Sequence, residues 1–308
     1  MTTPPRERAG WRRVAGAAFV VIAFLFLGSF IVANVRQLRE YEWTLRPAVL
    51  ALSLVMQMAG LFSGALAWQL LLRRMGTRAP LLDLARIRFV SGLARFVPGK
   101  VWPFIGAARL GTAAGIAPVV TVTSIVAHTV FALIAALLTA ALFLPLEVGA
   151  LGIRLGMLRW FAPALLVLAH PRIIGIALGL VGRLTRQPVA GWTGSWLDGL
   201  GLVAISVIGW LITGLALCTF IVSVTPLPAT AFTAVIGINA FAWVVGQLVF
   251  IAPAGLGAKD GAIAALLALF VAAPVAALLA VAVRLWSTLT EVILVAALVS
   301  VRAAPMPK

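Results

Sequence analysis

Cysteine, histidine and acidic residues are scarce in this chain. Its 308 residues include one cysteine, two histidines and only eight aspartates or glutamates. A single cysteine, Cys218, excludes an intramolecular disulfide and a cysteine-rich metal site, and two histidines provide no metal-binding spacing. Phosphate-binding loops and catalytic triads are also missing from the sequence. We therefore expect no metal, no cofactor and no enzyme activity.

Long stretches of the chain contain no charge. A membrane-spanning helix needs about 20 mainly apolar residues. Segments 14–33, 48–72, 110–146 and 199–258 reach that length without any Asp, Glu, Lys or Arg. Overall, 63% of the residues are hydrophobic and 10% are charged, whereas soluble proteins average roughly half and a quarter. The composition predicts an all-α, polytopic integral membrane bundle in the cell membrane.

The formal net charge of +16 does not indicate a nucleic-acid-binding protein. Nucleic-acid recognition requires basic residues gathered on a water-facing module, and this sequence has none. Basic residues cluster instead near the ends of apolar segments, as the positive-inside rule predicts. Four arginines in residues 1–13 place the N-terminus in the cytoplasm, and a second cytoplasmic loop is predicted from Arg73, Arg74, Arg78, Arg86 and Arg88.

The lengths of the apolar segments and the positions of helix-breaking residues predict six to eight spans in one transmembrane domain, residues 1–308. Full spans are expected near 14–33, 48–72, 112–144, 197–222, 229–250 and 274–301, with one more span and an amphipathic segment within 148–186. Residues 187–195 resemble a linker. They divide the chain into a first half, 1–186, and a second half, 196–308.

Two Pro-Gly breaks interrupt apolar stretches, one in each half. The first contains Pro98 and Gly99, and the second contains Pro253 and Gly255. Pro removes a backbone donor, so such segments are tolerated in a membrane only where protein or water surrounds them. Paired broken helices are typical of transporters built from internal repeats. We therefore predict two re-entrant elements and an internal repeat whose halves meet at a central site.

Charged residues accompany both breaks and recur on the last helix. Basic side chains beside loosened helix ends suit a phosphate or another anionic headgroup, although snorkelling to the interface is the alternative. Arg284 and Glu291 lie two helical turns apart, too far to pair tightly with each other. Arg284 is expected either to pair with Asp260 or Glu291 for structure alone or to line a substrate cavity. His128 lies in an apolar run and is expected to be either a hydrogen-bonded packing residue or part of a proton relay.

At these breaks the chain resembles the flippase-like membrane family that includes the transmembrane region of lysylphosphatidylglycerol synthases. Residues 253–261, Pro-Ala-Gly-Leu-Gly-Ala-Lys-Asp-Gly, resemble the family's Pro-Gly-Gly-Leu-Gly-x-Arg-Glu-Gly signature. Residues 95–102, Arg-Phe-Val-Pro-Gly-Lys-Val-Trp, resemble its Lys-Tyr-x-Pro-Gly-Lys-x-Trp motif. Departures are Ala254 for Gly, Asp260 for Glu and Phe96 for Tyr, and the shorter Asp260 side chain would alter a salt bridge there.

The resemblance implies movement of anionic, aminoacylated or polyprenyl-linked lipids between leaflets. Lipid synthesis is not expected, because only residues 301–308 follow the last predicted span. The residues expected to bind substrate are those of the two breaks and their neighbours: Arg95, Pro98, Gly99, Lys100, Trp102, Arg109, Pro253, Gly255, Gly257, Lys259, Asp260, Arg284 and Glu291.

Two other functions fit the same sequence. One is a non-transporting membrane partner of a lipid-modifying enzyme or glycosyltransferase. The other is a secondary transporter of a small anion, for which Asp260 and Glu291 are the few carboxylates able to couple an ion. No nucleotide-binding motif is present in the sequence, so lipid movement would be passive, gradient-driven or partner-driven.

Overall fold

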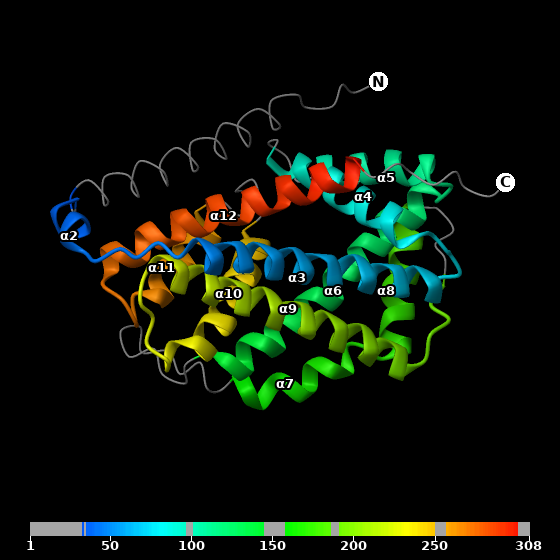
Figure 1. The fold of residues 1–308 in the computed structure, drawn as a ribbon. Helices are drawn as coiled ribbons and strands as arrows, with labels where there is room; N and C mark the ends of the chain where they lie inside the picture. Colours follow the sequence, from blue (N-terminus) through cyan, green and yellow to red (C-terminus); the bar gives the residue numbers. More distant parts are fainter. Residues whose placement is uncertain are drawn as a thin grey trace, which may run out of the picture.

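Every regular element in the described part of the chain is a helix (Figure 1). The computed structural model describes residues 33, 35–96, 101–144, 158–185, 191–249 and 257–300. The elements are α2 (Val35–Glu40), α3 (Pro47–Arg74), α4 (Leu81–Gly92), the 3-10 helix η1 (Leu93–Phe96), α5 (Trp102–Ala113), α6 (Pro118–Phe143), α7 (Leu158–Val167), α8 (Pro171–Thr185), α9 (Trp196–Val224), α10 (Ala231–Leu248), α11 (Ala258–Leu267) and α12 (Ala273–Ser300). The all-α prediction is confirmed.

Five of these helices, α3, α6, α9, α10 and α12, are long and apolar enough to cross a membrane. They coincide with five of the spans expected from the sequence. The remaining expected first span, 14–33, lies almost wholly outside the described residues. Within 148–186 the described part, residues 158–185, contains two short helices, and the span expected there stays a prediction because residues 148–157 lie outside the described part. α7 has 10 residues with Pro163 inside it, and α8 has 15 residues.

Residues 81–88, expected to belong to a cytoplasmic loop, form most of the helix α4 (Leu81–Gly92) instead, and residues 89–92 were expected to begin the first re-entrant element. Asp83 in its first turn pairs with Arg86 at 3.3 Å, and Nε of Arg86 donates to the carbonyl oxygen of Leu298 at 2.9 Å. The loop prediction treated these arginines only as a count of positive charge. Their contacts instead fasten α4 to the C-terminal part of α12.

The central feature of the fold is the antiparallel pair of long helices α3 and α9, which Figure 1 shows side by side. At one end, the amides of Thr44 and Arg46, just before α3, donate to the carbonyls of Val224 and Ser223 at 3.0 and 2.8 Å. At the other end, the last residue of α3 meets the segment that leads into α9. The two helices are thus tied at both ends and run in opposite directions.

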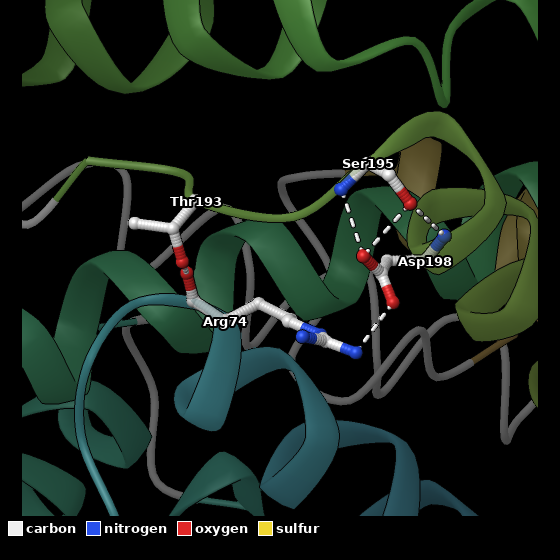
Figure 2. A network of polar contacts seen from close by, with 4 residues as sticks. All are labelled: Arg74, Thr193, Ser195 and Asp198. Carbon is white, nitrogen blue, oxygen red and sulfur yellow. Dashed lines mark hydrogen bonds and ion pairs between the residues drawn. The ribbon is translucent and has the colours of Figure 1, made fainter.

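Figure 2 shows the polar network at the second of these ends. Thr193 donates to the carbonyl of Arg74 through both its amide, at 3.0 Å, and its hydroxyl, at 2.6 Å. Ser195 and Asp198 cap the first turn of α9 reciprocally, and the Arg74 guanidinium pairs with Asp198 at 2.7 Å. A negative residue at a helix N-terminus is favourable, so one carboxylate both caps α9 and holds the end of α3.

Small residues allow the helix backbones to approach closely. A Cβ placed on Gly60 of α3 would lie 2.5 Å from Cγ2 of Thr213 and 3.3 Å from the carbonyl oxygen of Gly209, both on α9. A Cβ on Gly237 of α10 would lie 2.6 Å from the backbone nitrogen of Leu144, next to the end of α6. Lipid supplies no hydrophobic force between helices, so such close packing is a main source of association.

The order of helices occurs twice along the chain. A long helix (α3, α9) is followed by a packed pair with a break (α4 and α5, α10 and α11) and by a second long helix (α6, α12). α6 packs against α10 and α12 packs against α4, so each half contacts the interrupted pair of the other. Both α6 and α12 begin within an Ala-Pro-Val sequence. The antiparallel direction of α3 and α9 agrees with an inverted repeat, and the internal repeat stays a prediction.

Both predicted breaks lie outside the described residues, at 97–100 and 250–256. The helices on either side are described, and in each case they pack against each other. α4, α5 and α11 have 12, 12 and 10 residues, which corresponds to about 15–18 Å and is too short to cross a hydrocarbon core of about 30 Å. Re-entry of these pairs into the membrane stays a prediction.

The α6–α10 contact predicts a position where a methyl group disrupts the fold. In Gly237→Ala the added Cβ meets backbone atoms of Phe143 and Leu144, which cannot rotate away, so the melting temperature in detergent should fall by several degrees. Gly201→Ala is the matched control, because nothing lies within 4 Å of its Cβ position. Equal melting temperatures for the two variants would contradict the proposed packing.

Candidate functional site

A group of charged side chains gathers between the two halves, within the helical bundle. Its members come from α4, η1, α6, α11 and α12 and are linked by ion pairs, hydrogen bonds or electrostatic interaction. We call this group the charged cluster, and its residues are Arg88, Arg95, His128, Lys259, Asp260, Arg284 and Glu291.

Asp260 and Arg284 form the best-connected pair of the cluster. Nη1 of Arg284 donates to both carboxylate oxygens of Asp260, at 2.9 and 2.7 Å. Oδ2 of Asp260 also accepts from the amide of Gly257 at 3.1 Å, which caps the first turn of α11. Gly257 has a φ of +82°, a conformation that costs little only for glycine. The turn after the second break thereby aims Asp260 at α12.

Arg95 and Glu291 form the second pair, and it joins the two halves of the chain. Arg95 lies on η1, just before the first break, and its Nη2 donates to Oε2 of Glu291 on α12. The Arg95 side chain is 38% exposed, whereas those of Glu291 and Arg284 are 17% exposed. The cluster is therefore reached from outside the helical bundle on the Arg95 side.

Lys259 adds positive charge next to these pairs. It precedes Asp260 on α11 and has no ion-pair or hydrogen-bond partner among the residues that the structure describes. Attraction to Asp260 is opposed by repulsion from Arg95 and Arg284. The Asp260 carboxylate already binds Arg284, so Lys259 is left with unused capacity for an anion.

Arg88 and His128 extend the cluster toward α3 and α6. Nη1 of Arg88 lies 3.1 Å from Nδ1 of His128. Arginine has no acceptor, so it donates and Nδ1 accepts, which assigns the imidazole proton to Nε2. Gly64 of α3 makes room for the guanidinium, because a Cβ there would lie 3.1 Å from Nη2 of Arg88. His128 is 4% exposed, and its imidazole also interacts with the backbone of Gly64 on α3.

The cluster lies far from the ends of the long helices. Along α12, Arg284 is about 17 Å from Ala273, and Glu291 is about 14 Å from Ser300. His128 is about 15 Å from the start of α6. Ionisable groups at such positions in membrane helices usually pair or face water, and they commonly mark transport pathways.

The predicted site residues fall into three groups. Arg95, Gly257, Lys259, Asp260, Arg284 and Glu291 come together or adjoin the cluster. Trp102 and Arg109 are exposed residues of α5, and in the described part of the chain no ion pair joins Arg109 to the cluster. Pro98, Gly99, Lys100, Pro253 and Gly255 lie outside the described residues. Among the described residues, no group of three or more His, Cys, Asp or Glu side chains is arranged to hold a metal ion.

Sequence reasoning missed Arg88 and left His128 between packing and proton relay. His128 is a buried, hydrogen-bonded residue, and its partner is Arg88. Arg88 was counted as a loop charge, although it precedes Arg95 by the same seven residues that separate Arg284 from Glu291. That two-turn spacing was the available signal, because it places two arginines on one face of a continuous helical segment.

Comparison with known families gives one finding. The family model described as the lysylphosphatidylglycerol synthase TM region matches residues 13–294. Among curated proteins, none matches this chain.

The Asp260–Arg284 pair gives a test of the site geometry. Asp260→Asn leaves the Arg284 charge uncompensated in a largely buried position, and breaking such a pair costs about 3 kcal/mol of unfolding free energy. The double variant Asp260→Asn with Arg284→Gln removes the stranded charge. It should therefore melt in detergent at a higher temperature than the single variant. A double variant as unstable as the sum of both singles would show that the two residues do not interact.

Proposed function

Because the chain belongs to the family of lysylphosphatidylglycerol synthase TM regions, we propose that it moves an anionic lipid between the two leaflets of a membrane. The resemblance noted at the two breaks extends over most of the chain, since the match covers residues 13–294. Helices long and apolar enough to span a membrane support the same membrane setting. The cell membrane, with a cytoplasmic N-terminus, is the proposed location.

The observation that carries the proposal is a cationic cluster halfway along membrane helices. Arg88, Arg95, Lys259 and Arg284 carry four positive charges, and Asp260 and Glu291 carry two negative ones. Charge is costly in hydrocarbon unless it is paired or hydrated. An anionic headgroup entering the cluster would supply the missing negative charge while its acyl or prenyl chains stay in the lipid.

The arrangement of the helices supports movement as well as binding. Two inverted sets of helices contact each other across the interrupted pairs, and the Arg95–Glu291 ion pair crosses between the halves. In transporters of this kind, rocking of one repeat against the other exposes a fixed central site to each side in turn. The interrupted helices beside Arg95 and Lys259 would provide the backbone that adjusts.

Of the two other functions, a small-anion transporter would use the same charges, and the match to a lipid synthase TM region favours a lipid. Coupling to an ion would have to use Asp260 or Glu291, and both are engaged by arginines. A non-transporting partner of a lipid-modifying enzyme or glycosyltransferase predicts no lipid exchange by the isolated protein.

Leaflet exchange in proteoliposomes tests the proposed function. Labelled phosphatidylglycerol, farnesyl phosphate, farnesyl diphosphate and zwitterionic phosphatidylcholine would be compared, with exchange followed by the fraction accessible to an external reductant or phosphatase. At least one anionic lipid should exchange faster than in protein-free vesicles. Lys259→Gln should slow it about tenfold, because it removes a charge-assisted contact without stranding an ion-pair partner.

Arg183→Gln is the matched control, since Arg183 is an exposed residue of α8. Its exchange rate should equal that of the unaltered protein. If no anionic lipid exchanges faster than in protein-free vesicles, the transport proposal fails. If Lys259→Gln exchanges as fast as the control, the cluster is not the site.

A further inference from the structure

A partly buried arginine without an acidic partner among the described residues lies at the α4 end of the charged cluster. Among the described residues, the only hydrogen bond of the Arg88 side chain goes to His128, a neutral acceptor when it accepts through Nδ1. A guanidinium has five donors and stays charged in proteins. Gly64 has no side chain, so the Arg88 guanidinium lies directly against the backbone of α3. Most of its binding capacity is therefore unused.

Few acidic residues of the chain are available to neutralise the positive charge of Arg88. Of the eight, three pair elsewhere: Glu40 with Arg36, Asp83 with Arg86, and Asp198 with Arg74. Glu42 is exposed before α3, and Glu7 and Glu147 lie outside the described residues. Asp260 and Glu291 already bind Arg284 and Arg95. Two of the four cluster cations, Arg88 and Lys259, thus have no acidic partner in the described part of the chain.

Arg88 is close enough to the rest of the cluster to interact with it electrostatically. Its charge and that of Arg284 both repel Arg95, and Arg95 and Arg284 both repel Lys259. Arg88 and Arg95 lie about 10 Å apart along one helical segment, a separation that two long side chains can close. Arg88 and Lys259, the two cations without an acidic partner, are thus both electrostatic neighbours of Arg95.

We propose that Arg88 and Lys259, on either side of Arg95, form two anion subsites, and that the lipid bound there carries its headgroup on a phosphomonoester or diphosphate. A phosphodiester lipid such as phosphatidylglycerol supplies one negative charge, and a lysyl ester of it has a net positive charge. A phosphomonoester carries about −1.5 to −2 at neutral pH, and a diphosphate carries at least as much. Only these headgroups neutralise both subsites. This inference rests on the proposed function and specifies its substrate class.

Binding in detergent micelles tests the charge requirement. The intact protein should bind farnesyl diphosphate and farnesyl phosphate at least tenfold more tightly than phosphatidylglycerol. Inorganic pyrophosphate is the soluble counterpart and should bind at least tenfold more weakly than farnesyl diphosphate. Equal affinity for pyrophosphate would identify a soluble anion as the ligand, and equal affinity for phosphatidylglycerol would remove the two-charge requirement. Either result overturns the proposal.

Arg88 variants test the residue. Arg88→Gln should weaken farnesyl diphosphate binding about tenfold and phosphatidylglycerol binding less than threefold, and Arg88→Lys should restore most of the preference. A purely structural role would change both lipids equally. Arg183→Gln is again the control and should change neither. If Arg88→Gln does not fold, the ranking of the probes by the unaltered protein still decides the outcome.

The binding experiments and the exchange experiments test the two proposals independently. A protein that binds diphosphate lipids selectively but exchanges no lipid keeps the binding inference and loses the transport function. A protein that exchanges anionic lipids without regard to headgroup charge keeps transport and loses the inference.

Discussion

Charge buried among membrane helices requires an opposite charge, and this requirement shapes the central part of the molecule. α12 contributes one basic and one acidic residue, two turns apart, and each finds its partner on a different element. Arg284 binds Asp260 at the start of α11, and Glu291 binds Arg95 on η1. The segments next to both predicted breaks are therefore fastened to the same helix. Loss of one partner would strand a charge where water cannot easily reach it.

The close antiparallel contact of α3 and α9 gives this arrangement its frame. Glycines permit the approach, and hydrogen bonds and one ion pair hold both ends of the helix pair. With these two helices inverted relative to each other, the following helices of each half reach across to the interrupted pair of the other. The charged cluster lies where these crossings meet. A site where the two halves meet is affected by any relative movement of the halves.

Prediction from sequence succeeded where a property is local. Apolar run length and helix-breaking residues identified five long helices. Their observed bounds lie within two residues of the expected ones, except that α6 begins at Pro118 instead of 112. The two motifs led to the family that the match confirms. Within 148–186 the described residues form two short helices, with Pro163 inside the first, and the expected span stays a prediction. Local hydropathy cannot decide whether a short apolar helix crosses, dips or lies flat.

The sequence by itself determined the membrane class, the helical architecture and the presence of unusual charge beside two breaks. These follow from composition and spacing, because hydrocarbon tolerates few alternatives to apolar helices. Only the tertiary structure decided how the charges pair. Arg284 had two candidate partners in the sequence and has one in the fold, and Arg88 moved from a predicted loop to the hydrogen-bond partner of His128. Ion pairing depends on atoms brought within a few ångströms from distant helices, and that proximity is set by helix packing and direction, which no local pattern records.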